Sequence, residues 1–159
     1  MDTSVSIIGL VITLLIGIPL FFAMRSNSIN KNKIKQIKAQ FSQNNHYNFE
    51  ITEEQNKKVL ALDDKNKGFL LMDFNDKKED IVTFIDLNSV DSCKLSITNE
   101  SNSNTIVQID FNFQNKKDNK IQIAPFYKIQ NDQIGQICLH EDHQLAKKWS
   151  EILQKCISN

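Results

Sequence analysis

Apolar residues follow three patterns along this chain. The first is an unbroken apolar run over 5–24, VSIIGLVITLLIGIPLFFAM, which contains no charged residue. A helix of about 20 apolar residues is long enough to cross the roughly 30 Å hydrocarbon core of a bilayer. A helix buried in a soluble core would keep a polar stripe, and this run has none. The run therefore predicts a single transmembrane anchor within 1–24.

The second pattern is an alternation of apolar and polar residues in short runs. In TIVQIDFNFQ, Ile109, Phe111 and Phe113 fall on one side of an extended chain and Gln108 on the other. Such a period of two is typical of a strand with one buried face. Turn-forming segments such as DDKNKG separate the runs, and no helical pattern lies between them. We therefore predict seven antiparallel strands, within 46–52, 57–63, 68–74, 80–90, 92–98, 105–114 and 120–129.

The third pattern has helical spacing and lies near the C-terminus. In HEDHQLAKKWSEILQKCIS, apolar residues recur three and four positions apart, among them Trp149, Ile152 and Leu153, with charged residues on the opposite side. This spacing predicts one amphipathic helix whose apolar stripe packs on the sheet. We expect Trp149, Ile152 and Leu153 to belong to the domain core. Together the patterns indicate an α+β, mostly β domain over 46–159.

The order of these elements resembles the pleckstrin-homology-like (PH-like) superfold, with Trp149 inside KKWSEIL at the position of the tryptophan common in its closing helix. The stretches KVLALDDKNKGFLLM, FIDLNSVDSCKL and AKKWSEIL are also similar to a group of uncharacterised bacterial proteins that join an N-terminal anchor to such a domain. The resemblance covers 46–159. It implies a seven-stranded antiparallel curved sheet or barrel closed by the C-terminal helix, and it carries no catalytic residue.

Charge divides the chain into three parts. Residues 2–24 carry one acid and no base, 25–45 carry five bases and no acid, and 46–159 carry fourteen bases and eighteen acids. Flanking segments rich in Lys and Arg stay on the cytoplasmic side of a membrane. We therefore expect an inner-membrane, single-pass protein whose N-terminus lies outside and whose domain is cytoplasmic. The five bases that follow the apolar run are Arg25, Lys31, Lys33, Lys35 and Lys38.

A cleaved secretory signal is the alternative to a retained anchor. Such a signal carries its positive charge before the apolar stretch and a small-residue cleavage site after it. Here the charges follow the run, and no such site precedes Arg25. The pattern therefore favours a retained anchor.

Two features near the anchor suggest contacts with other molecules. Gly9, Thr13 and Gly17 lie four residues apart, a spacing that allows two membrane helices to pack closely, although Gly and Thr are also common in any membrane helix. The basic spacer over 25–45 has two interpretations. It forms an amphipathic helix along anionic lipid headgroups, or it is a solvated tether.

Candidate ligand residues are few. Cys138, His140 and His143 are possible metal ligands, but a zinc site needs four ligands, or three plus water, and no second pair matches them. The alternative is a strand end followed by a helix start. Four turn lysines could contact a lipid headgroup: Lys57, Lys58, Lys65 and Lys67. Asp63 and Asp64 lie beside the last two and offset their charge, which favours ordinary solvated turn lysines. Cys93, Cys138 and Cys156 have no disulfide-framework spacing and suggest reduced thiols.

The functional prediction follows from the anchor more than from the domain. The chain has no nucleophile elbow and no glycine-rich phosphate loop, so we expect neither an enzyme nor a bound cofactor. The acidic excess over 46–159 argues against a nucleic-acid partner. We predict a membrane-tethered interaction or scaffold module that binds a membrane protein or its own copy. The alternative is a lipid- or metal-responsive membrane sensor.

Overall fold

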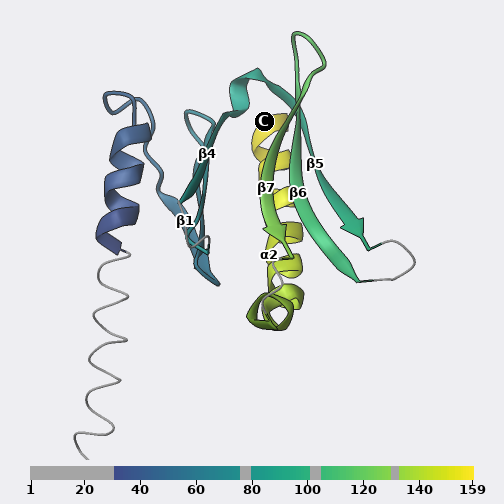
Figure 1. The fold of residues 1–159 in the computed structure, drawn as a ribbon. Helices are drawn as coiled ribbons and strands as arrows, with labels where there is room; N and C mark the ends of the chain where they lie inside the picture. The colour runs from purple at the N-terminus through teal and green to yellow at the C-terminus, as the bar shows by residue number, and fades with distance from the viewer. Residues whose placement is uncertain (1–30, 76–79, 101–104, 130–132) are drawn as a thin grey trace, which may run out of the picture. The chain divides into compact units, whose positions relative to one another are not determined.

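A computed structural model describes residues 31–75, 80–100, 105–129 and 133–159, without the side chains of 133–137 (Figure 1). Residues 41–159 form one compact unit, and the helical residues 31–40 belong to a separate one. The helix over 31–41 ends before three residues with left-handed backbone, Gln43, Asn44 and Asn45, at φ values of 46°, 59° and 66°. Asn adopts this conformation more readily than most residues, so the sequence suits the end of a helix.

The described residues of the unit over 41–159 form seven strands, a short 3-10 turn and one long helix. The strands pair antiparallel in two sheets, a four-stranded sheet A in the order β1-β2-β3-β4 and a three-stranded sheet B in the order β5-β6-β7. A 3-10 turn, η1 (Leu87–Ser89), connects the sheets, and α2 (Gln133–Ser158) follows the last strand. The strand bounds are β1 (Ile51–Gln55), β2 (Lys58–Asp63), β3 (Gly68–Asp73), β4 (Ile81–Asp86), β5 (Val90–Asn99), β6 (Ile106–Asn115) and β7 (Ile121–Lys128).

The predicted single curved sheet or barrel is wrong, because the seven strands are divided between the two sheets. The division falls inside the run 80–90, which was expected to be one strand. There the Asp86 side chain accepts a hydrogen bond from the Asn88 backbone N–H at 3.0 Å and caps η1. This local contact ends β4 and turns the chain into a new sheet, because a capped turn competes with continued strand pairing.

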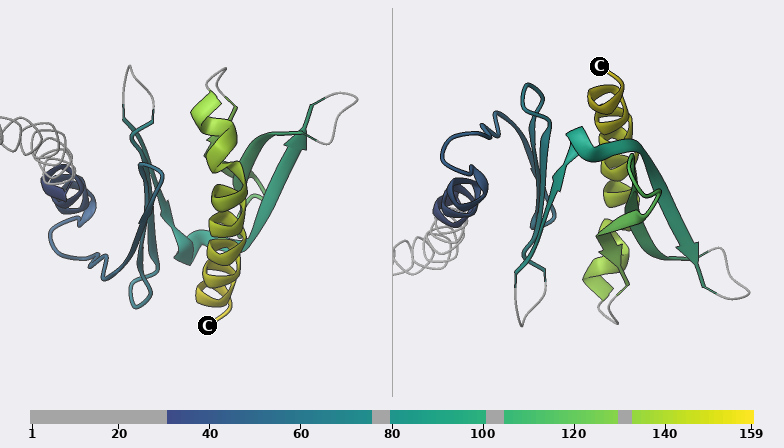
Figure 2. Two further views of the ribbon diagram at one scale, coloured as in Figure 1. Left: turned by 90° about the horizontal axis from the view of Figure 1, so that it is seen from below. Right: turned by 90° about the horizontal axis from the view of Figure 1, so that it is seen from above.

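The main core lies between the inner faces of the two sheets and α2. Leu60 and Leu71 from sheet A, Phe111 and Phe113 from sheet B and Trp149 from α2 are at most 2% exposed and belong to one cluster. Both views of Figure 2 show α2 between the sheets. Leu153 is also fully buried, and Ile152 packs partly buried against the same cluster.

Sheet A also buries its other face. Val59, Ala61, Leu70 and Met72 alternate with the main-core residues of β2 and β3 and are fully buried. Phe84 lies opposite Leu70 on this face, and the rings of Tyr47 and Phe49 pack against it at centroid distances of 5.1 and 6.4 Å. The chain before β1 therefore contributes an aromatic layer to sheet A. This explains why β2 and β3 are apolar at nearly every position.

The single-pass membrane assignment and the cytoplasmic localisation require correction. Within the ranges that the structure describes, no helix is long and apolar enough to cross a membrane. Helix α2 carries charged residues such as Lys147 and Glu151 along its length. The structure therefore does not support either assignment. The predicted anchor within 1–24 lies outside the described residues.

Gly68 provides a test of the aromatic layer. A Cβ atom at this position would lie 2.4 Å from Tyr47 Cδ1, much closer than van der Waals contact. We expect Gly68→Ala to lower the free energy of unfolding by about 1–3 kcal/mol, because the ring must move out of a packed layer. Urea denaturation measures the effect. In a Tyr47→Ala background, Gly68→Ala should lower the free energy of unfolding much less. An equal decrease in both backgrounds would contradict the packing of Tyr47 against Gly68.

Candidate functional site

Helix α2 has two different sides. Leu145, Trp149 and Leu153 face the core, and its polar residues line two open grooves, one beside β5 and the other beside β1. Among the described residues, both β5 and β1 are edge strands, each paired on one side only. An edge strand carries unpaired backbone donors and acceptors, so these grooves are the places where the fold can add a further strand.

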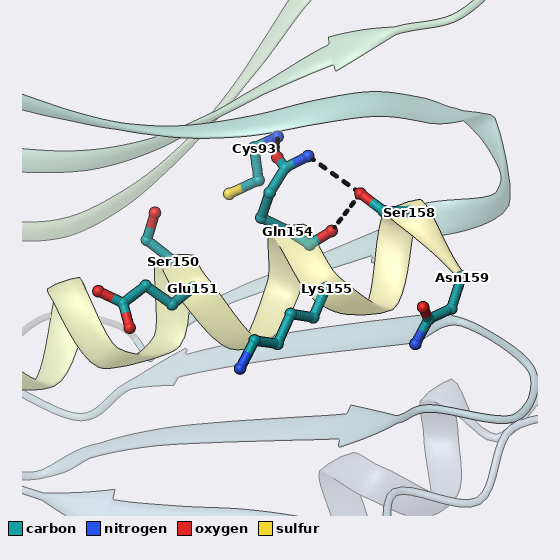
Figure 3. A pocket seen from close by; sticks show the side chains of 7 residues that line it. All are labelled: Cys93, Ser150, Glu151, Gln154, Lys155, Ser158 and Asn159. Carbon is teal, nitrogen blue, oxygen red and sulfur yellow. Dashed lines mark hydrogen bonds between the residues drawn. The ribbon is translucent and has the colours of Figure 1, made fainter.

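The first groove lies between β5 and the C-terminal half of α2 (Figure 3). Its volume is about 590 Å³, within the range of ligand-binding clefts. Its lining contains both charges and several hydroxyl or amide groups, which suits a polypeptide better than a purely apolar ligand. The lining residues are Cys93, Ser150, Glu151, Gln154, Lys155, Ser158 and Asn159.

Gln154 occupies the backbone edge of β5. Its side-chain oxygen accepts a hydrogen bond from the Cys93 backbone N–H at 2.9 Å. The Gln154 amide nitrogen lies 3.4 Å from Ser158 Oγ, and that hydroxyl donates to the Gln154 backbone carbonyl at 2.9 Å (Figure 3). A side-chain amide therefore takes the place that the carbonyl of a neighbouring strand would occupy.

The Cys93 contact fixes which backbone groups of β5 face the edge. In an antiparallel pair, residues alternate between those bonded to the neighbouring strand and those directed away from it. Because the Cys93 N–H points to Gln154, the N–H groups of Leu95 and Ile97 also point away from β6. Exposure rises in the same direction, from 5% at Cys93 to 43% at Ile97. The open part of the edge is therefore at Leu95 and Ile97.

The Cys93 thiol is a packing group. Burial raises its pKa to about 12, so the thiol is protonated at neutral pH. Burial also raises the pKa of Cys156; the Lys67 charge acts to lower it, and the Asp64 charge adds to the increase. A protonated buried thiol is a weak nucleophile, so neither cysteine gives this groove a reactive group.

The second groove lies between β1 and the first half of α2 and has a volume of about 650 Å³. Glu53 is its central charge, bonded to Lys148 Nζ at 2.8 and 2.9 Å and to Trp149 Nε1 at 2.7 Å. Burial acts to raise the pKa of Glu53, but the Lys148 and Trp149 hydrogen bonds and the Lys148 charge outweigh it and lower that pKa. The lining residues are Glu53, Gln55, His140, Glu141, Gln144, Leu145 and Lys148.

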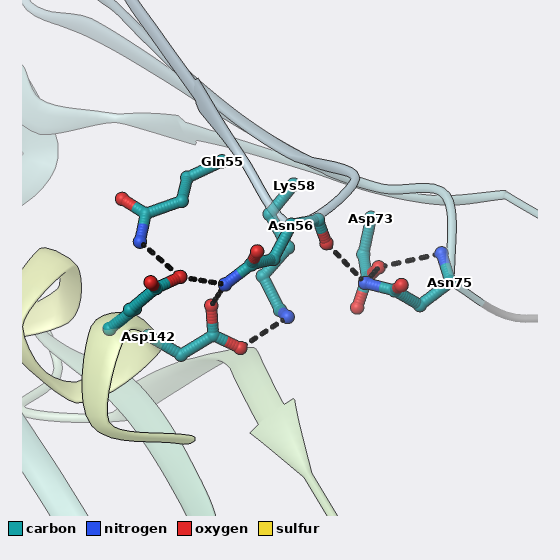
Figure 4. A network of polar contacts seen from close by, with 7 residues as sticks. Gln55, Asn56, Lys58, Asp73, Asn75 and Asp142 are labelled. Atoms are coloured by element: carbon teal, nitrogen blue, oxygen red, sulfur yellow. Dashed lines mark hydrogen bonds and ion pairs between the residues drawn. The ribbon is translucent and has the colours of Figure 1, made fainter. Parts of the chain in front are cut away.

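A buried ion pair lies next to the second groove (Figure 4). Lys58 Nζ and Asp142 Oδ2 are 2.7 Å apart, with the two residues 5% and 1% exposed. Asn56 Nδ2 donates to the other Asp142 oxygen at 2.9 Å, and the Lys58 ammonium lies 5.5 Å from the Phe126 ring centroid. Every polar group of the pair thus has a partner, as a buried charge requires. The pair joins the β1–β2 hairpin to α2.

The possible metal ligands are not gathered into a site. Cys138, His140 and His143 all lie on α2, where residues two apart point in different directions. His140 is exposed and belongs to the second groove, whereas Cys138 and His143 are half-buried. In the described part of the chain, no three His, Cys, Asp or Glu side chains are grouped so that they could hold a metal ion.

The predicted spacer residues are described only in part. Lys31, Lys33 and Lys35 are exposed on the helix over 31–41, Lys38 is half-buried, and burial lowers the pKa of Lys38. Ile34 and Ile37 of the same helix are buried, so this stretch is helical with an apolar side. The fifth basic residue, Arg25, lies outside the described residues. The same holds for the three small residues of the predicted anchor, Gly9, Thr13 and Gly17.

The turn lysines do not form a set. Lys57 and Lys65 are exposed, but Lys58 is buried in its ion pair, so its interpretation as a solvated turn residue is wrong. Asp63 is also buried rather than a surface counter-charge. It accepts hydrogen bonds from the backbone N–H groups of Asn48, Lys65 and Asn66 at 2.6, 3.0 and 3.0 Å, which lower its pKa against the effect of burial.

Comparisons with protein-family models, with curated proteins and with solved structures found no match to this chain. The resemblance to PH-like domains therefore stays a prediction.

The Lys58–Asp142 pair can be tested by removing one charge. Lys58→Met leaves Asp142 buried and without its cation, which typically costs about 3–5 kcal/mol. We expect urea denaturation to show a decrease of that size in the free energy of unfolding. The double variant Lys58→Met with Asp142→Leu should recover most of the lost free energy of unfolding. The description would be contradicted if Lys58→Met cost less than about 1 kcal/mol, the usual size for an exposed pair.

Glu53 predicts a dependence of stability on pH. Its pKa is lowered in the folded protein, so its charge stabilises the fold above the ordinary value of 4.5 and this stabilisation is lost as the pH falls through the lowered value. Glu53→Gln keeps an acceptor for Trp149 but removes the charge. We expect this variant to be less stable than wild type at pH 7, by about 1 kcal/mol at most because the pair is partly exposed, with the difference disappearing in acid. A difference that is constant between neutral and acidic pH would contradict this role.

Proposed function

We propose that residues 41–159 form a non-enzymatic protein-interaction module that binds an extended segment of a partner protein along the open edge of β5. The observation that carries this proposal is the hydrogen bond from the Cys93 N–H to the Gln154 side chain. It supports an edge whose backbone groups face a groove, where a backbone N–H donates a hydrogen bond to an amide oxygen from outside the sheet.

Strand addition would use the groups next to this contact. The N–H and C=O groups of Leu95 and Ile97 are directed away from β6, and a segment paired with them would become the fourth strand of sheet B. In this mode of binding, main-chain hydrogen bonds provide affinity and alternate side chains provide specificity. The Gln154 side chain marks one end of the site, because its oxygen already accepts the hydrogen bond from the Cys93 N–H.

The surroundings of the edge suggest the chemistry of the segment. One side of an added strand would lie beside Leu95 and Ile97, which are partly exposed, and therefore favours apolar side chains. The other side would lie beside Lys94, an exposed residue directed to the opposite face of β5, and favours acidic side chains. We therefore propose an extended segment in which apolar residues alternate with polar or acidic ones.

The proposal can be tested with peptide ligands selected against the full chain from a library of random extended peptides. Ile97→Pro removes the outward N–H, and proline is tolerated on an edge strand where that group does not bond its neighbour. The matched control Ile97→Ala shortens the side chain and keeps the N–H. We expect Ile97→Pro to weaken binding at least about tenfold more than Ile97→Ala, because a lost main-chain hydrogen bond and its unpaired partner cost roughly 1.4 kcal/mol or more.

Hydrogen exchange provides an independent measurement on the same complexes. Bound peptide should slow exchange at the Leu95 and Ile97 amides, whereas the amides of Lys94 and Ser96, which already pair with β6, should change little. Selected peptides that protect other strands, or that bind both Ile97 variants equally, would contradict the proposal.

A further inference from the structure

The residues that carry the outward N–H groups of β5 differ in burial. Cys93 is 5% exposed, whereas Leu95 is half-buried and Ile97 is 43% exposed. Without a partner, water can bond the N–H groups toward Ile97, but a donor in a buried residue needs an acceptor from the protein itself. Gln154 supplies that acceptor, with its side-chain oxygen 2.9 Å from the Cys93 nitrogen (Figure 3). The chain therefore fills one position of its own strand-binding edge.

The group that fills this position is chemically similar to what an added strand would bring. A glutamine side chain ends in an amide, with a carbonyl oxygen and N–H groups like those of a peptide unit. This amide comes from α2, 61 positions away from Cys93, and lines the groove beside β5. The Gln154 oxygen and a backbone carbonyl of a partner segment would therefore compete for the same N–H group.

The Gln154 side chain is held loosely apart from its contact with Cys93. Its nitrogen lies 3.4 Å from Ser158 Oγ, which is long for a hydrogen bond. Ser158 is exposed, and its hydroxyl already donates to the Gln154 backbone carbonyl at 2.9 Å, so water can replace the amide there. The groove of about 590 Å³ around the side chain leaves space for other rotamers. The amide can thus leave the Cys93 N–H while Trp149 and Leu153 keep α2 packed in the core.

We propose that the Gln154 side chain is an intrachain competitor of the partner segment and sets how far toward Cys93 that segment pairs with β5. This inference rests on the proposed function. A segment that pairs only with Leu95 and Ile97 leaves the Gln154 contact in place. A longer segment has to displace the Gln154 oxygen before its own carbonyl can bond the Cys93 N–H. One hydrogen bond is then exchanged for another, so the added length brings little affinity. Gln154 is in this sense a specificity-determining residue for segment length.

The test compares Gln154→Ala, which removes the competing acceptor, with the matched control Gln154→Glu, which keeps an oxygen at nearly the same reach. The probe is a peptide selected from the random library and trimmed to the shortest form that slows hydrogen exchange at the Leu95 and Ile97 amides. Two further peptides carry two added alanines, one at the N-terminus and the other at the C-terminus. Two residues are the spacing between successive outward donors of a strand, so one of these extensions reaches Cys93 in either binding direction.

Titration calorimetry with the full chain measures the dissociation constants. For one of the two extended peptides, Gln154→Ala should lower the dissociation constant roughly three- to tenfold relative to wild type, the effect of one net hydrogen bond. The trimmed peptide and the other extension should bind wild type and Gln154→Ala within about twofold of each other. Gln154→Glu should bind neither extended peptide more tightly than wild type. In the free chain, the Cys93 amide should exchange faster in Gln154→Ala than in wild type, and thermal unfolding checks that each variant keeps its fold. Gln154→Ser, which also shortens the side chain, should repeat the result.

Two outcomes overturn the competitor role of Gln154 and leave the proposed function intact. The first is that wild type and Gln154→Ala bind both extended peptides equally. The second is that Gln154→Ala changes the affinity of the trimmed and the extended peptides by the same factor, because the side chain then acts on the whole edge rather than on its end. Failure of the proposed function looks different. In that case no selected peptide slows exchange at the Leu95 and Ile97 amides, and both proposals fail.

Discussion

Trp149 packs between the two sheets and joins their inner faces into one core. A three-stranded sheet and a four-stranded sheet each have an apolar inner face, and neither is stable unless that face is buried. The Trp149 ring is fully buried 6.0 Å from Phe69 of sheet A, and its N–H donates to Glu53. One side chain thus fills the space between the sheets and satisfies its polar group at the margin of the core.

This position of α2 also creates both grooves. Because α2 crosses between the sheets, its apolar residues are used by the core and its polar residues lie beside the edge strands β5 and β1. On the β1 side, Glu53 is already bonded to Lys148 and Trp149 of α2. On the β5 side, Gln154 holds only the Cys93 donor, so the edge farther along at Ile97 stays open. That asymmetry is the structural basis for placing partner binding on β5.

The division into two sheets shows where local patterns are insufficient. The alternation within β6 correctly placed Ile109, Phe111 and Phe113 on a buried face, because the period of two is a local property of an extended chain. The same alternation cannot reveal whether consecutive strands pair in one sheet. At 80–90 an Asp86 cap, a contact over two residues, outweighed the continuous apolar pattern and separated β4 from β5.

The positions of most strands, the amphipathic nature of α2 and the burial of Trp149 could be predicted, because these follow from the spacing of apolar residues within one element. Which polar residues meet depends on how distant elements pack. Gln154 bonds Cys93 across 61 positions and Lys58 bonds Asp142 across 84. Lys58 and Asp142 looked like solvated turn and helix-start residues because a charge appears buried only when its distant partner is known.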